Sequence, residues 1–203
     1  MKRVAVTGLG VISPVGNDIP TFWNALCSGT CGIGPITKFD ATDYPVKLAA
    51  EVRNFAPKQY MEKLDILHSD VYTHFAMAAA CQAVADSGIA GTLDAERVGV
   101  YIGSGIGGIA TFMTEHSKLL NRGPRRVSPY FIPMMIPNMA SSMIAMRYHF
   151  HGPAMPMVTA CASGTNAIGE ALRLIRHGYA DAMVAGGAEA TVNALAAAGF
   201  SNM

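Results

Sequence analysis

Cys161 is the residue best placed for covalent chemistry in this 203-residue chain. It ends the short apolar run 157–160 and precedes small residues that open a predicted helix at Ser163. This pattern predicts a sharp strand-to-helix turn, which projects the thiol away from a sheet and beside the unpaired N–H groups of a helix N-terminus. Those donors and the helix dipole favour a thiolate and can stabilise an oxyanion. We therefore predict a nucleophilic cysteine, with a buried structural thiol as the alternative, because free cysteines are often core residues.

Two other patterns could carry chemistry, and each has a plainer interpretation. The loop GSGIGG, residues 103–108, follows a predicted strand and matches G-x-G-x-x-G. A dinucleotide site also requires an acidic residue about 20 positions later, and none occurs between Glu115 and Glu170. We favour glycines that let backbones approach closely beside a substrate path. The cysteine pair at 27 and 31 and the histidine pair at 149 and 151 lack zinc-like spacing, so no metal or cofactor is expected.

The elements that must position Cys161 alternate between apolar strands and helices. Residues 123–138 contain four prolines and are expected to be irregular. Strands are predicted at Lys2–Thr7, Lys47–Val52, Arg97–Ile102, Met157–Ala160 and Asp181–Ala185, and helices at Pro20–Leu26, Asp70–Ser87 and Ser163–His177. This alternation indicates an α/β fold whose mostly parallel sheet is covered on both faces.

The composition narrows the class of protein. Apolar residues make up 51% of the chain and charged residues 14%, with a formal net charge of +1, which favours neither nucleic acid nor a membrane surface as partner. No apolar run approaches the roughly 20 residues needed to span a bilayer, and the N-terminus lacks a signal-peptide pattern. A cytoplasmic protein with reduced thiols is expected. The closing segment ALAAAGFSNM is apolar and uncapped, which suggests part of a longer protein.

Long motifs along the whole chain resemble the N-terminal half of the β-ketoacyl-acyl-carrier-protein synthases, of the synthase II type used in fatty acid biosynthesis. They are RVAVTGLGVISPVGN, RVGVYIGSGIGG, GPRRVSPYFIPMMIPNMAS, VTACASGTNAIGEA and DAMVAGGAEA. The resemblance implies a thiolase-like fold, in which two similar α/β halves build a five-layered αβαβα body, usually as a homodimer. Residues 1–203 would then form the N-terminal domain, with the C-terminal catalytic half absent.

The family resemblance also implies an acyltransferase reaction. Cys161 would take an acyl group from acyl carrier protein as a thioester, with its backbone N–H as one oxyanion donor. Malonyl carrier protein would lose carbon dioxide, and its carbanion would attack that thioester to give a 3-oxoacyl product two carbons longer. Ile106, Phe131 and Phe200 match positions that shape the acyl pocket, in part from across the dimer.

The sequence departs from the family pattern in two respects. Two histidines, a lysine and a second glycine-rich loop belong to the family's C-terminal half, so full condensation by this chain alone is not expected. The stretch KLDILHSDVYTHF, residues 63–75, replaces a basic segment that helps dock the carrier protein. Docking would then depend on basic residues elsewhere, such as Arg125 and Arg126, with Lys58 and Lys63 retained. The alternative to an acyltransferase is an inactive truncated or partner subunit that dimerises without catalysis.

Overall fold

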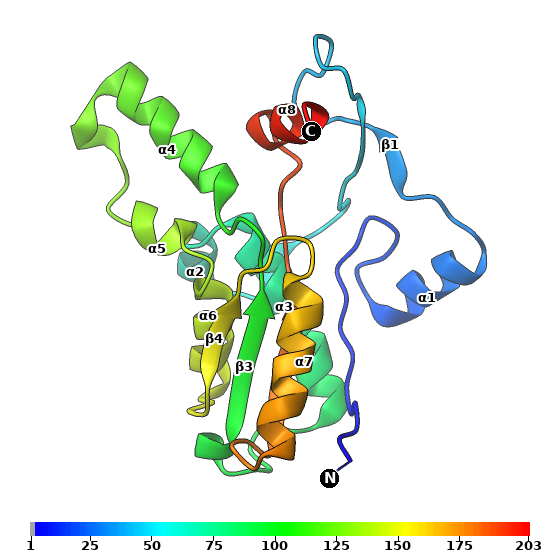
Figure 1. Cartoon of the computed structure of the whole chain (residues 1–203). Coiled ribbons are helices and arrows are strands. Elements are labelled where there is room, and N and C mark those ends of the chain that lie inside the picture. Colours follow the sequence, from blue (N-terminus) through cyan, green and yellow to red (C-terminus); the bar gives the residue numbers. More distant parts are fainter. Residues whose placement is uncertain (1–2) are drawn as a thin grey trace.

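The computed structural model describes residues 3–203 and forms an α/β arrangement around a short parallel sheet (Figure 1). The elements in chain order are α1 (Ile19–Cys27), β1 (Ile33–Pro35), β2 (Leu48–Ala50), η1 (Pro57–Gln59), α2 (Lys63–Leu67), α3 (Val71–Ser87), η2 (Ala95–Arg97), β3 (Val98–Gly103), α4 (Ile109–Arg122), η3 (Pro124–Arg126), α5 (Phe131–Met135), α6 (Met139–Tyr148), β4 (Ala154–Met157), α7 (Ser163–Arg176), β5 (Ala182–Gly187) and α8 (Ala194–Ser201).

The sheet has the strand order β4-β3-β5, with all pairs parallel, and a separate antiparallel hairpin joins β1 to β2. Every residue of β3 is buried, as expected for a central parallel strand. Helices α3 and α6 cover one face of the sheet and α7 covers the other (Figure 1). The predicted α/β class and covered sheet are confirmed.

Helix α3 forms the buried support of the sheet. Asp70 caps its N-terminus by accepting a hydrogen bond from the Tyr72 N–H, and Gly88 ends it in the left-handed conformation, as the sequence predicts. The Asp70 carboxylate also accepts from the N–H and hydroxyl of Thr111, at 2.8 and 2.7 Å. One buried carboxylate therefore joins the start of α3 to the start of α4.

Two predicted strands are wrong. Of Lys2–Thr7, residue 2 lies outside the described residues, and residues 3–7 are extended but unpaired. The segment instead runs along α3, where the N–H groups of Leu9 and Val11 donate to the side chains of Asp86 and Gln82. The strand predicted at 157–160 is β4, three residues earlier, because pairing with β3 begins at Ala154.

Other elements were confirmed or missed. The helices predicted around α1, α3 and α7 are confirmed, as are the strands around β2, β3 and β5. Residues 123–138 are irregular but contain η3 and the short helix α5, and α4, α6 and α8 were not predicted. In the described part of the chain, no helix is both long and apolar enough to cross a membrane.

A serine side chain bridges β3 and β4. The N–H groups of Val100 and Ser104 bond directly to the carbonyls of Pro153, just before β4, and Met157, its last residue. The hydroxyl of Ser141, on α6, accepts from the Ile102 N–H and donates to the Met155 carbonyl, both at 2.9 Å. Ser141 is fully buried, so water cannot replace it.

We predict that Ser141→Ala lowers the free energy of unfolding by about 1–3 kcal/mol, because it leaves a buried N–H and a buried carbonyl without this partner. Urea unfolding measures the change. The control is Ser142→Ala, at the next, half-buried position of α6. Equal losses for the two variants would contradict the bridging role.

The free energy of unfolding should depend on pH through the buried side chain of His74. Burial lowers the pKa of His74, although its hydrogen bonds to Ile66 and Ser69 and the nearby Asp70 carboxylate oppose this effect. The unfolded chain therefore binds a proton near the ordinary value of 6.5 that the folded chain takes up only at lower pH. The free energy of unfolding should be fully retained above that pH and fall as the pH decreases toward the folded pKa.

His74→Gln should flatten this pH dependence, because glutamine keeps an N–H donor but does not titrate. Urea unfolding at about pH 7.5 and about pH 5.5 gives the comparison. The exposed His116 provides the control variant His116→Gln, which should follow the wild type. An unchanged slope in His74→Gln would show that other groups cause the loss.

Candidate active site

Cys161 lies on a tight turn between β4 and α7, and its side chain is exposed. The preceding residue, Ala160, has a φ of +51°, in the left-handed region that a residue with a Cβ seldom adopts. Backbone strain of this kind is typical of functional sites. The predicted turn is confirmed, and the alternative of a buried core thiol is wrong.

Ser163, the first residue of α7, holds the turn in place. Its buried hydroxyl donates to the Ala160 carbonyl at 2.6 Å and accepts from the Thr159 N–H at 2.9 Å. The N–H groups of Ala162 and Ser163 close the turn onto the carbonyls of Thr159 and Ala160. The sequence analysis treated Ser163 only as a small neighbour of the thiol and missed this role.

Glycines place the start of α7 directly on the sheet. A Cβ at Gly103, the last residue of β3, would lie 2.3 Å from the Ser163 backbone. A Cβ at Gly187, the last residue of β5, would lie 2.8 Å from the Cα of Gly164. The helix N-terminus therefore contacts the carboxyl ends of two strands, which is where α/β proteins commonly bind ligands.

The glycine-rich loop lies beside the same turn and is held by Glu189. The Glu189 carboxylate accepts from the N–H of Gly105 at 2.7 Å and of Ile106 at 3.1 Å. The backbone donors that a dinucleotide phosphate would need are thus used by this chain's own side chain. The favoured interpretation, a close backbone approach, agrees with Gly108, where a Cβ would lie 2.3 Å from the Met134 carbonyl oxygen.

The three predicted pocket residues lie on different elements. Ile106 is in the glycine-rich loop, next to the Cys161 turn, and is 43% exposed. Phe131 begins α5 and packs against Phe112 of α4, with ring centroids 6.4 Å apart. Phe200 lies on α8 and lines an apolar cavity of about 210 Å³ between that helix and the β1–β2 hairpin. Of the three, Ile106 directly follows Gly105, whose Cβ position lies 3.5 Å from the Ala160 carbonyl oxygen of the turn.

A cysteine nucleophile is usually activated by a neighbouring base or a metal ion. Within residues 3–203, the side-chain contacts of His68, His74, His116 and His177 are made with groups other than Cys161. No group of three His, Cys, Asp or Glu side chains in this part of the chain could hold a metal ion. The described residues thus place the Cys161 thiol at a helix N-terminus, and these four histidines make their contacts elsewhere.

His68 and Tyr130 form a contact that the sequence did not reveal. The ring of His68, just after α2, stacks on Tyr130 with centroids 3.7 Å apart and planes 15° apart. This stack joins the segment carrying Lys63 to the segment that follows Arg125 and Arg126 in η3.

Comparisons with known proteins agree with this site. The chain matches the β-ketoacyl synthase N-terminal domain family over residues 1–203. It is 46% identical over 201 residues to 3-oxoacyl-[acyl-carrier-protein] synthase 2 of Staphylococcus aureus, and 47% identical over 201 residues to the synthase 2 of Coxiella burnetii. Each alignment covers 98% of this chain and 49% of the relative.

A solved structure gives the same result for the fold. The ishigamide ketosynthase/chain length factor superposes with a TM-score of 0.89 at 29% identity, over 97% of this chain and 49% of that chain. The neighbouring structures are thiolase-like ketosynthases, which confirms the predicted fold. The chain spans about half the length of the curated relatives it matches. It belongs to the β-ketoacyl synthase family.

Proposed function

We propose that this chain carries the acyl-accepting nucleophile of a 3-oxoacyl-[acyl-carrier-protein] synthase that acts in fatty acid elongation, in the cytoplasm. The observation that supports this most directly is the exposed Cys161 on a strained turn at the start of α7. A thiol there is accessible to a thioester and lies at the positive end of a helix of 14 residues.

In the proposed reaction, the Cys161 thiolate attacks the carbonyl carbon of an acyl thioester on acyl carrier protein. A new C–S bond forms, the backbone N–H of Cys161 stabilises the oxyanion, and the carrier thiol leaves with a proton from solvent. Malonyl carrier protein then loses carbon dioxide. The resulting carbanion forms a C–C bond to the acyl carbon, the bond to Cys161 breaks, and a 3-oxoacyl carrier thioester results.

We assign residues 1–203 to the N-terminal domain of this enzyme and infer that condensation needs a histidine-bearing half outside them. The resemblance assigns two histidines and a lysine to that half, where they would polarise the malonyl carbonyl. Loss of one part of a catalytic unit can remove most of the rate acceleration. Acyl transfer to Cys161 is the step this chain can support by itself, with Ile106, Phe131 and Phe200 as pocket residues.

The proposed carrier partner is acidic, so its docking site should be basic. Arg125 and Arg126 at the end of α4, with Lys63 on the segment joined to them by the His68–Tyr130 stack, supply positive charge on adjacent segments. This set would replace the basic stretch that the family carries around residues 63–71. Lys58 lies close in sequence, in η1.

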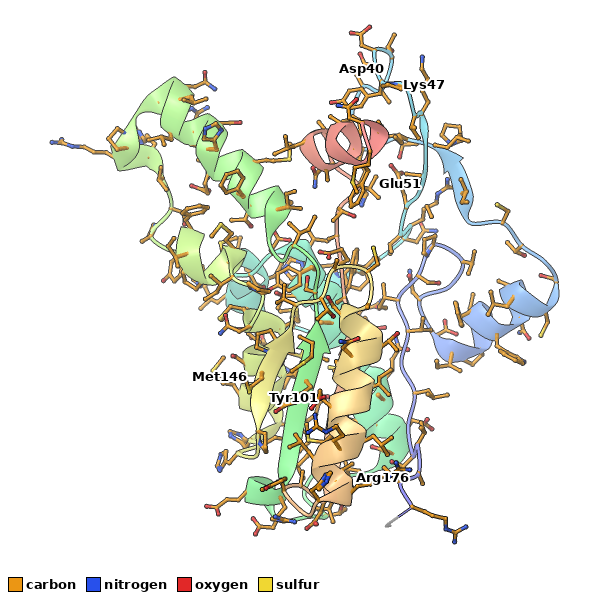
Figure 2. All side chains as sticks on the ribbon, in the orientation of Figure 1. Asp40, Lys47, Glu51, Tyr101, Met146 and Arg176 are labelled. Carbon is orange, nitrogen blue, oxygen red and sulfur yellow. The ribbon has the colours of Figure 1, made fainter. Side chains whose placement is uncertain are left out.

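A homodimer is the proposed assembly, with β4 as the contact strand. Strand β4 is one edge of the sheet, and the side chains of Met155 and Val158 are 52% and 54% exposed there. Met146 of α6 also projects beside this edge (Figure 2). An exposed strand edge flanked by apolar side chains is suited to pair with a second copy.

We predict that wild-type chain incubated with acyl-loaded carrier protein gains one acyl mass on Cys161, and that Cys161→Ala gains none. Mass spectrometry of the intact chain and its peptides gives the measurement. Cys161 should also react with iodoacetamide about tenfold or more faster than the exposed Cys27, as expected of a catalytic nucleophile compared with a surface thiol.

Cys27→Ala is the matched control and should be acylated like the wild type. Absence of the acyl group, together with equal alkylation rates at Cys161 and Cys27, would instead favour an inactive partner subunit.

We also predict that Met155→Lys raises the dissociation constant of the dimer by about tenfold or more, because a charge on the edge strand must be desolvated on pairing. Size-exclusion chromatography with light scattering over a range of concentrations measures it. Leu48→Lys, at a 57% exposed position of the hairpin, is the control. A wild-type chain that stays monomeric throughout would refute the proposed assembly.

A further inference from the structure

We propose that Glu189 is a positioning residue that holds the glycine-rich loop 103–108, and Ile106 with it, against the Cys161 turn. In this way Glu189 sets which acyl chains the thiol accepts. The inference rests on the proposed acyl-transfer function and adds a residue that controls its selectivity.

The Glu189 carboxylate binds the loop through both oxygens. Oε2 accepts from the N–H groups of Gly105 and Ile106, and Oε1 accepts from the Ser104 hydroxyl at 3.2 Å. The Ser104 oxygen in turn accepts from the Gly107 N–H at 3.0 Å. Four successive loop residues therefore depend on one carboxylate.

Glu189 lies two residues after the end of β5, beside the point where the loop leaves β3. β5 stays in register with β3 up to the pair Gly103 and Gly187. The next residue, Ala188, donates its N–H to the Gly103 carbonyl at 2.9 Å. Glu189 follows directly, so its side chain reaches the loop as the loop leaves β3.

Backbone hydrogen bonds fix the two ends of the loop, from the Ser104 N–H to the Met157 carbonyl and from the Gly108 N–H to the Met135 carbonyl, and Glu189 binds the middle. Four of its six residues are glycines, and Gly107 has a φ of +74°. Glycine loses the most backbone freedom on ordering, so such a loop needs strong partners. Hydrogen bonds to a charged acceptor are about twice as strong as neutral ones. Glu189 makes them although it is an exposed residue.

Carboxylate, loop and turn meet at Gly105. A Cβ at this residue would lie 2.9 Å from Glu189 Oε2 and 3.5 Å from the Ala160 carbonyl oxygen, one residue before the thiol. Ile106 follows, and the same oxygen of Glu189 binds its N–H. A change in the carboxylate therefore moves the pocket wall relative to Cys161 without touching the thiol.

The test compares Glu189→Ala and Glu189→Gln with wild-type chain. Glutamine keeps one acceptor oxygen, so it should rescue part of the effect. Glu170→Ala, which removes a half-buried carboxylate that pairs with Arg173 on α7, is the matched control. Two quantities are measured: hydrogen exchange of the amides 104–107, and the ratio of Cys161 acylation rates for long-chain and short-chain acyl carrier protein.

In Glu189→Ala, exchange of the loop amides should rise about tenfold or more, while exchange in β3 stays constant. The ratio of acylation rates should move toward one, because a loosened Ile106 no longer discriminates. Both quantities should be intermediate in Glu189→Gln. This variant is compared with the wild type alone if circular dichroism shows that the alanine variant does not fold.

Two outcomes would overturn the proposal: unchanged loop exchange in both variants, or faster exchange with an unchanged ratio of acylation rates. Failure of the proposed function is distinguishable from both. In that case wild-type Cys161 is not acylated by any carrier thioester, and the selectivity role is overturned with it.

Discussion

The close contact between the N-terminus of α7 and the ends of β3 and β5 is the constraint on which the site depends. Gly103 and Gly187 let the helix backbone approach to distances that any side chain would prevent. This approach fixes Ser163, and the Ser163 hydroxyl fixes the strained Ala160. The exposure of Cys161 therefore follows from close packing of Gly103 and Gly187 against the start of α7, although these residues are far apart in the sequence.

Local sequence signals were sufficient where one element determines its own ends. Asp70 and Gly88 bound α3, and Asp18 caps α1, as their residue types predict. The small residues after Cys161 likewise predicted the turn. The general class of fold and the turn that exposes Cys161 could thus be predicted without a structure, because capping and chain reversal depend on neighbouring residues.

Features that depend on partners far away in the chain could not be predicted from the sequence. The apolar residues 3–7 have the composition of a strand, yet strands form only where another strand can accept their hydrogen bonds, and this segment lies along α3. The bridge that Ser141 of α6 makes between Ile102 of β3 and Met155 of β4 likewise depends on a partner from another element. Glu189 lies more than 80 residues from the loop that it binds, so no local pattern could have pointed to it.

Several segments are held by carboxylates that accept from backbone N–H groups outside the strand and helix hydrogen bonds. Asp70 binds the N–H of Thr111, Glu115 binds that of Ser128 at 2.7 Å, and Glu189 binds two in the glycine-rich loop. Buried Glu51 does the same for the hairpin (Figure 2).

The hydrogen bond from Lys118 lowers the pKa of Glu115, so that carboxylate stabilises the fold above its ordinary pKa and loses this effect as the pH falls through the lowered value. Backbone amides that point at a carboxylate need its negative charge. The contact between Glu115 and the Ser128 N–H should therefore weaken as the pH falls through the lowered value, because protonation removes the charge that the N–H group binds.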